Sequence, residues 1–164
     1  MTVVGVTIEW RWGLDLSFVL SRMHTATTSL LHGAITGSII DSFHAVYNAL
    51  GFGHREFIYS LAMERDLTAK GHNAVREFSV MVYYQGLPLA RESIDMVVDD
   101  LVVVENKSAE RLRPADYEQP RCYLCCTFFE VALLLHFGPR PTFHQTIFEN
   151  RLKLHGNEVP RAPR

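Results

Sequence analysis

The chain has 164 residues, of which 48% are hydrophobic and 21% charged, so it is long enough to bury one core and too short to count on two. Its composition, with 10 Gly and 7 Pro, excludes collagen-like and disordered chains. A formal net charge of −2 argues against a protein held on duplex DNA by phosphate contacts alone, since such proteins are usually basic. A nucleic-acid partner would therefore need a local basic patch or bound metal ions.

The N-terminal stretch is interrupted by Glu9, Arg11 and Asp15, so no apolar run in the sequence approaches the roughly 20 residues of a membrane span. The same charges do not suit a signal peptide. The chain has three cysteines, Cys122, Cys125 and Cys126. An odd number of cysteines close together in the sequence does not suit a disulfide framework. We therefore expect a reducing, cytoplasmic setting and no membrane partner.

Two helices are predicted first. Apolar residues recur at steps of three and four over Ala34–Leu50, which is the period of one helical face, and Gly51 follows as a C-terminal cap. A second helix is predicted over Arg55–Lys70, ended by Gly71.

The period then changes to two, which indicates strands. Residues alternate over Phe78–Tyr84, and the stretches Ser93–Val98 and Leu101–Lys107 flank an acidic turn, Asp99-Asp100. We interpret the last two stretches as a β-hairpin.

The remaining elements are a helix from Pro114 to about Phe128, a buried strand over Val131–Phe137 and an edge strand within 141–150. The predicted fold class is therefore α/β, with the order helix, helix, three strands, helix, strand.

We expect one domain over residues 34–150. Residues 1–33 do not join its pattern, although Thr2–Trp10 could form a strand and Leu14–Met23 a short helix, and we assign them no function. Residues 151–164 form a weakly basic tail.

The chemistry-bearing residues lie in the predicted hairpin. Glu105 and Lys107 are two apart in a strand, so both side chains lie on one face of the sheet. Whether Asp95 joins them depends on the turn. A three-residue loop places Asp95 opposite Glu105, whereas a two-residue Asp99-Asp100 loop places it on the other face.

Two close carboxylates repel each other unless a hard divalent cation such as Mg²⁺ lies between them. A lysine beside them can orient an attacking water or stabilise charge on a phosphate. The plainer alternative is a surface hairpin with a Glu/Lys pair and an acidic turn.

Several stretches resemble a known family. The segment YNALGFGHREFIY, which contains Gly53-x-x-Glu56-x-x-Tyr59, resembles the GxxExxxY family of small bacterial proteins, within the PD-(D/E)xK nuclease superfamily. Further segments agree in order over about residues 30 to 153: YYQG from Tyr83, IDMVV from Ile94, VVVENK from Val102, LRP from Leu112 and LLLHFGPRPTF from Leu133. Ordered segments with compatible gaps are more specific than any one motif.

The resemblance implies a restriction-endonuclease-like core, with helices packed on a small mixed sheet. It implies a nuclease that uses Mg²⁺ or Mn²⁺ to hydrolyse phosphodiester bonds of nucleic acid, with DNA expected as the substrate rather than RNA. The metal ligands would be Asp95 and Glu105, with Glu56 as an acidic residue from the helical segment. Lys107 would be the catalytic lysine, and Gln119-x-x-x-Tyr123 resembles the glutamine and tyrosine motif of the RecB-type branch.

Three positions depart from the family pattern. Ala45 stands where relatives often carry a glutamate, Asn106 replaces the usual apolar residue within E-x-K, and Pro120 interrupts a helix unless that helix starts near Tyr117. They suggest as an alternative a catalytically inactive nuclease-fold module that binds nucleic acid or protein. A third alternative is a structural partner that forms homodimers through the hairpin edge and the N-terminal stretch.

Other residue groups have structural interpretations. We expect the three cysteines to pack as small hydrophobes rather than to hold a cluster, and no two of the eight histidines have a zinc-ligand spacing. A set of aromatic residues is expected to lie in the core: Tyr47, Tyr83, Tyr84, Phe128, Phe129 and Phe137.

Overall fold

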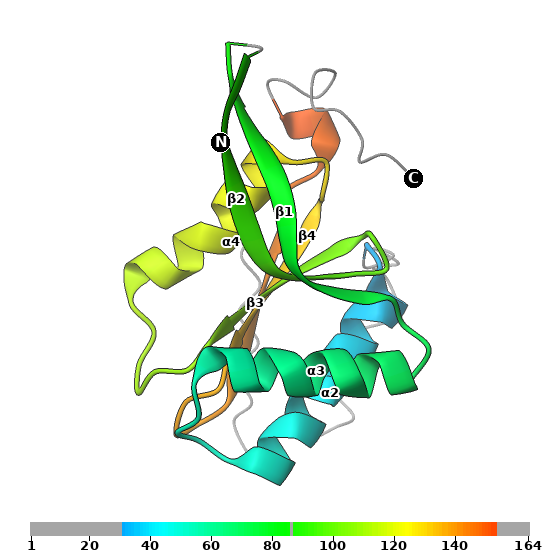
Figure 1. Ribbon diagram of the computed structural model, residues 1–164, viewed down its shortest axis with the longest axis vertical. Coiled ribbons are helices and arrows are strands. Elements are labelled where there is room, and N and C mark those ends of the chain that lie inside the picture. Colours follow the sequence, from blue (N-terminus) through cyan, green and yellow to red (C-terminus); the bar gives the residue numbers. More distant parts are fainter. Residues whose placement is uncertain (1–30, 86, 154–164) are drawn as a thin grey trace, which may run out of the picture.

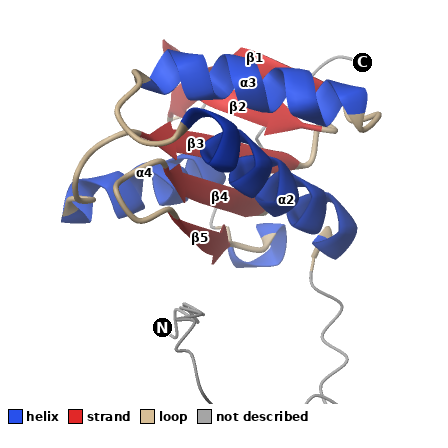
Figure 2. Cartoon of the chain, turned by 90° about the horizontal axis from the view of Figure 1, so that it is seen from below, coloured by secondary structure: helices blue, strands red, loops and turns tan. Residues whose placement is uncertain are grey.

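The computed structural model describes residues 31–85 and 87–153 of the chain, which form one mixed sheet with helices on both faces (Figure 1; Figure 2). The elements are α2 (Gly33–Leu50), α3 (Glu56–Ala69), β1 (Ala74–Tyr84), β2 (Leu87–Val98), β3 (Val102–Lys107), α4 (Pro114–Cys126), β4 (Val131–His136), β5 (Thr142–Ile147) and a short 3-10 helix, Asn150–Leu152. The α/β class and the predicted order of elements, including the edge strand, are confirmed.

The sheet has the order β1-β2-β3-β4-β5, and every neighbouring pair is antiparallel except β3 and β4. Parallel neighbours need a crossover connection, and α4 provides it. β4 is buried on both faces, as predicted, and is apolar up to its last residue, His136. The crossover fixes α4 against the sheet face that carries the odd-numbered residues of β3.

Two apolar cores lie on opposite faces of the sheet. α2 and α3 pack against residues such as Met96, Val104 and Leu133, all fully buried. α4 packs against the alternate residues, including Val103 and Ala132. Because side chains of a strand alternate between faces, the two sets identify which face any residue of β3 or β4 occupies.

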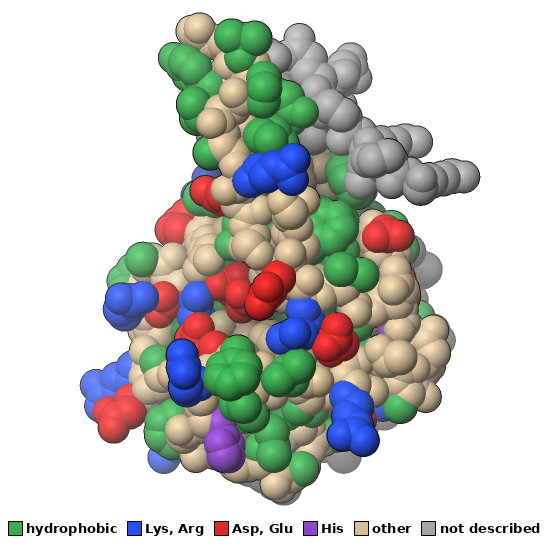
Figure 3. All heavy atoms as spheres, viewed as in Figure 1, with side chains coloured by type: hydrophobic (Ala, Val, Ile, Leu, Met, Phe, Trp, Pro, Cys, Tyr) green, Lys and Arg blue, Asp and Glu red, His purple; other side chains and the backbone are tan. Residues whose placement is uncertain are grey.

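β1 and β2 are both longer than the predicted strands and form a hairpin that projects beyond the rest of the sheet (Figure 1). Its tip gathers exposed hydrophobic side chains, visible at the top of Figure 3. The expectation that Tyr83 and Tyr84 lie in the core is therefore wrong: they are 43% and 63% exposed. Their alternating pattern identified a strand, but no second layer covers this part of it. Phe129 and Phe137 are core residues, as expected.

α4 corrects two predictions. Cys122, Cys125 and Cys126 are exposed rather than packed in the core, because the helix turns Tyr123 and Leu124 towards the sheet. The predicted helix start at Pro114 is confirmed, but the expectation that Pro120 interrupts the helix unless it starts near Tyr117 is wrong, because the helix continues through a buried proline at position 120. A capping box between Arg113 and Asp116 anchors its first turn.

The predicted strand and helix within residues 1–30 and most of the predicted basic tail lie outside the described residues. In the part of the chain that the structure describes, no helix is both long enough and apolar enough to cross a membrane.

Candidate active site

The β2–β3 turn decides which face Asp95 occupies. The turn spans residues 99–101, with Met96 paired to Val104 and Val98 to Val102. Continuing this register places Asp95 opposite Glu105, and Asp95 Oδ2 accepts a hydrogen bond of 2.9 Å from the backbone N–H of Asn106. The three-residue alternative is therefore the one found, and the two-residue alternative is wrong.

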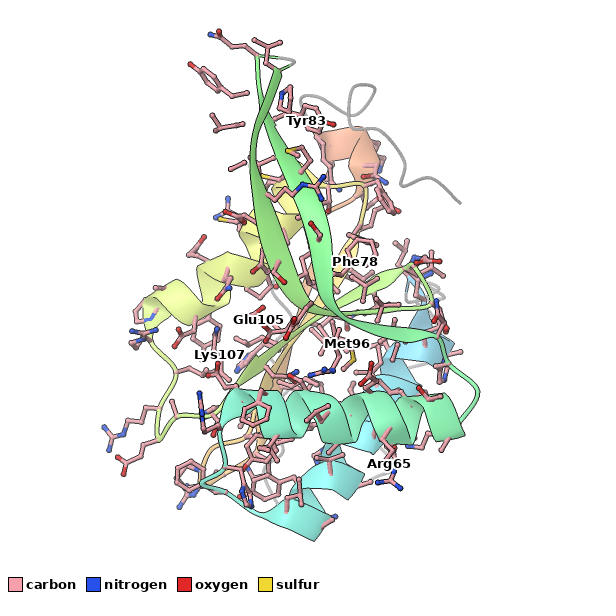
Figure 4. The ribbon with its side chains drawn as sticks, viewed as in Figure 1. Arg65, Phe78, Tyr83, Met96, Glu105 and Lys107 are labelled. Atoms are coloured by element: carbon pink, nitrogen blue, oxygen red, sulfur yellow. The ribbon has the colours of Figure 1, made fainter. Side chains whose placement is uncertain are left out.

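Glu105 and Lys107 form a short ion pair on the same face. Lys107 Nζ donates to Glu105 Oε1 at 2.6 Å, and the two side chains are 16% and 1% exposed. Figure 4 shows both on β3, between the base of the β1–β2 hairpin and the start of α3. We refer to Asp95, Glu105 and Lys107 as the carboxylate–lysine site.

The site holds more negative charge than its lysine can balance. Burial, and then the charge of Asp95, raises the pKa of Glu105 to about 7. Burial also raises the pKa of Asp95. For Lys107, burial lowers the pKa, but the hydrogen bond and charge of Glu105 and two further carboxylates outweigh it, so the net shift is upward. Both carboxyl groups therefore lose their protons less readily than usual, and a cation bound beside them would favour their charged forms.

Glu56 reaches the edge of the site from the first turn of α3. Its Oε1 accepts a hydrogen bond of 3.1 Å from the backbone N–H of Ser108, which directly follows Lys107. The Ser108 hydroxyl donates to the carbonyl oxygen of His54 at 2.6 Å. Glu56 lies close enough to raise the pKa of both Asp95 and Glu105.

The glycine and tyrosine of the motif hold the loop that precedes α3. Gly53 has φ +114°, which L side chains rarely adopt. The Tyr59 hydroxyl donates to the carbonyl oxygen of Gly51 at 2.7 Å and accepts from the backbone N–H of His54 at 3.2 Å. The spacing of Gly53, Glu56 and Tyr59 thus fixes the start of α3 beside the end of β3.

Gln119 and Tyr123 lie on one face of α4, as their spacing predicts. Gln119 Nε2 donates to the Tyr123 hydroxyl at 2.8 Å, and that hydroxyl donates to the carbonyl oxygen of Ser93 at 3.2 Å. Burial raises the pKa of Tyr123, and the charges of Glu105 and Asp95 add to the rise. Among the described residues, neither Gln119 nor Tyr123 hydrogen-bonds to the carboxylate–lysine site, but the Tyr123 hydroxyl lies close enough to feel the charges of its carboxylates.

Asn106 has a structural partner that the sequence pattern did not reveal. Its side chain is fully buried on the α2–α3 face, and its amide donates to Ser60 Oγ at 2.9 Å. Ser60 lies one residue beyond the motif tyrosine, but nothing in its spacing marked it. The polar residue in E-x-K is thus held by a hydrogen bond to α3.

The described residues contain no group of three or more His, Cys, Asp or Glu side chains placed to hold a metal ion by themselves. Glu56 is turned to Ser108, so Asp95 and Glu105 are the two carboxylates available on the shared face. Of these, Glu105 Oε2 is buried and finds no hydrogen-bond partner within the described part of the chain. Mg²⁺ commonly binds through one or two carboxylates and takes its other ligands from water and phosphate.

The mixed sheet with helices on both faces is consistent with a nuclease-like fold. A sequence model of the PD-(D/E)XK nuclease superfamily matches residues 33–148, and the chain belongs to this superfamily. No curated protein and no solved structure matches the chain.

Proposed function

We propose that this protein is a metal-dependent nuclease that hydrolyses phosphodiester bonds of nucleic acid, with DNA as the preferred class. The observation that carries the proposal is the register that sets Asp95 opposite Glu105, with Lys107 on the same face. Superfamily membership supports a nucleic-acid substrate.

The two carboxylates suit a hard divalent cation, Mg²⁺ or Mn²⁺. A bound cation would give the buried Oε2 of Glu105 a partner. It would also lower the raised pKa of Glu105, because it favours the charged form of the carboxylate. Asp95 and Glu105 would hold the ion, and Glu56 would join them only after leaving Ser108. When bound, such an ion supplies Lewis-acid stabilisation of phosphate charge and lowers the pKa of bound water.

Lys107 would position the attacking water and stabilise charge on the phosphate. Its raised pKa keeps the ammonium charged at neutral pH, so it serves as a hydrogen-bond donor and not as a general base. Gln119 would assist by orienting the Tyr123 hydroxyl, to which it donates.

We also propose that the chain belongs to the GxxExxxY family within this superfamily. This assignment is supported by the contacts of Gly53, Glu56 and Tyr59, which give each motif position a role in placing α3. We further propose residues 34–150 as the nuclease-like domain and a reducing, cytoplasmic setting, which suits three free cysteines.

The test is cleavage of single-stranded DNA, duplex DNA and RNA with Mg²⁺ or Mn²⁺. Lys107→Ala should lower the metal-dependent rate about a hundredfold or more, because it removes a charge that acts in the transition state. The matched control is Lys70→Ala, which removes another lysine paired with a carboxylate, Asp66 at 2.8 Å, outside the site. Lys70→Ala should cut at the wild-type rate.

Two results would count against the proposal. Cutting that survives in Lys107→Ala would assign the activity to another site or a contaminant. If no nucleic acid is cut, while metal still raises the melting temperature, the inactive binding module becomes the better interpretation, because ligands stabilise the state that they bind.

A further inference from the structure

A groove on the α4 face has no role in the chemistry above. It encloses about 550 Å³ and is lined by residues from the segment after β3, the start of α4 and the β4–β5 connection. Four of its side chains matter here: Arg111, Tyr117, His136 and Arg140. We call it the basic groove.

The basic groove adjoins the carboxylate–lysine site. Lys107 and His136 are register partners in the parallel β3–β4 pair. Val103 and Ala132 of the same two strands pack on the α4 side, so by alternation Lys107 and His136 also lie on that face. His136 Nε2 contacts the carbonyl oxygen of Ala109 at 2.7 Å, which holds the segment after Lys107 against β4. The groove therefore begins one strand away from the lysine.

The two arginines of the basic groove carry charge that the protein does not neutralise. Arg111 and Arg140 are exposed, and neither forms an ion pair with any of the described residues. Two other arginines nearby are paired: Arg113 with Asp116 and Arg121 with Glu118. Glu110 is the acidic residue of the lining, so the lining contains two guanidinium groups and one carboxylate. On a chain of net charge −2, this is a local basic patch.

The opposite side of α4 has the reverse charge. A second pocket there, of about 420 Å³, is lined by Glu92 and Glu118 with Gln119 and Tyr123. Its carboxylates repel phosphates, whereas the basic groove attracts them. A nucleic-acid strand at the site would therefore leave it on the basic side.

The basic groove also offers an aromatic surface. Tyr117 is 41% exposed, and its ring is held edge-on against His144 at 4.9 Å between centroids. Basic grooves with exposed aromatic rings bind single-stranded nucleic acid, since phosphates pair with the cations while a base stacks on the ring. Bases within a duplex are already stacked and do not offer this contact.

We propose that the basic groove binds a single-stranded segment of nucleic acid next to the phosphodiester held at Lys107. Arg111 and Arg140 contact backbone phosphates, and Tyr117 stacks with a base. This inference rests on the proposed nuclease function and extends it by naming the form of the substrate.

The first experiment measures binding without cleavage, by fluorescence anisotropy of a labelled oligothymidine of about 15 nucleotides in EDTA. The combined Arg111→Gln and Arg140→Gln variant should raise Kd about tenfold, and its salt dependence should become shallower by about 1.4 in log–log slope, since each lost phosphate contact removes about 0.7. Tyr117→Leu should raise Kd about fivefold or more, while Tyr117→Phe keeps the ring and binds as the wild type.

The control is Arg65→Gln. Arg65 is an exposed arginine on α3, and Figure 4 shows it far along that helix from Lys107. Arg65→Gln makes the same kind of substitution away from the groove and removes one positive charge, as each groove substitution does, so its Kd should stay within about twofold of the wild-type value. All substituted groove residues are exposed, and a thermal melt verifies that each variant is folded.

The second experiment separates the groove from the chemistry. The arginine variant should raise KM and keep kcat at saturating substrate, whereas Lys107→Ala should lose kcat and keep its affinity for the oligonucleotide. If the wild type cuts nucleic acid, but the combined Arg111→Gln and Arg140→Gln variant binds and cuts like Arg65→Gln, the groove proposal is wrong and the proposed nuclease function is unaffected. Equal or tighter binding of duplex would also overturn it. If the wild type neither binds nor cuts any nucleic acid, the proposed function fails, and the groove proposal with it.

Discussion

The two faces of the central sheet differ in how far helices cover them. On one face, α2 and α3 enclose an apolar core in which Asn106 is held by its hydrogen bond to Ser60. On the other face, α4 encloses a smaller core, and the carboxylate–lysine site lies at its edge. Buried charges are costly unless they are paired or hold a ligand. The difference teaches that charged side chains are placed on the face with the smaller core, where the proposed chemistry would take place.

This comparison predicts that the two faces can be damaged separately. The largest effect should come from Asp95→Asn, which removes a carboxylate charge but keeps an oxygen to accept from the Asn106 N–H. We expect the metal-dependent cleavage rate to fall about a thousandfold, equivalent to roughly 4 kcal/mol of transition-state stabilisation. Single-turnover cleavage measures it, and a melting temperature close to that of the wild type would show that the fold is intact. A similar rate for Asp95→Asn and wild type would remove Asp95 from the metal site.

The opposite outcome is expected on the covered face. Leu133 is fully buried between the sheet and the α2–α3 layer, so Leu133→Ala should lower the free energy of unfolding by about 3 kcal/mol through lost contacts and a cavity. The folded fraction should cut at the wild-type rate. Urea denaturation measures the first quantity, with Leu89→Ala as control, because Leu89 is 68% exposed on the projecting hairpin. A large loss of kcat in folded Leu133→Ala would show that the two faces are not separable.

The β2–β3 turn connects the two faces, because its length decides where Asp95 lies. Asp99 and Asp100 both have positive φ, 53° and 57°. Asp99 Oδ1 accepts the Asn73 N–H at 2.8 Å, and its Oδ2 contacts His72 Nδ1 at 2.7 Å. Asp99→Ala should therefore lower the free energy of unfolding by about 2 kcal/mol.

Asp100→Ala is the matched control for the turn. It changes a second left-handed residue, but one whose side chain is exposed and makes no hydrogen bond within the described residues. Asp100→Ala should lower the free energy of unfolding by less than about 1 kcal/mol. Equal losses in the two variants would mean that the cost comes from placing alanine at a positive φ and not from losing the hydrogen bonds of Asp99.

The sequence predicted the elements well because each carries a regular pattern. The helical period over α2 and the alternation over the strands both follow from one face being buried, and the bounds differ mainly at the ends. The first residues of β1, 74–77, and of β2, 87–92, were missed, because strand pairing there is accompanied by little burial. The exposed cysteines were misplaced because a sequence does not show how α4 is rotated on the sheet.

For the candidate site, the sequence could name residues but not their register. The spacing of Glu105 and Lys107 alone placed them on one face, whereas Asp95 depended on a turn of two or three residues that the acidic pair did not decide. The basic groove could not be foreseen either. Arg111 and Arg140 are far apart in the sequence, and only the parallel pairing of β3 with β4 brings their segments together.

The last test concerns the excess negative charge on the α4 face of the sheet, first through pH and then through a smaller effect of metal. The pKa of Glu105 is raised from 4.5 to about 7. Between these values the folded protein without metal holds a proton that the unfolded chain has lost. Its free energy of unfolding therefore falls as the pH rises through this window, and the loss is complete above about pH 7. The free energy of unfolding of Glu105→Gln should not show this fall between pH 4.5 and about 7.

Divalent metal should reverse the trend, because it binds the deprotonated carboxylates. At about 10 mM Mg²⁺, a site of millimolar affinity raises the free energy of unfolding by about 1 kcal/mol near pH 8, and by clearly less near pH 6 where Glu105 is mostly protonated. Urea denaturation at the two pH values, with KCl at matched ionic strength, measures the difference. Glu105→Gln should show little response at either pH. An equal Mg²⁺ effect at both pH values, or an undiminished one in Glu105→Gln, would place the ion away from the carboxylate–lysine site.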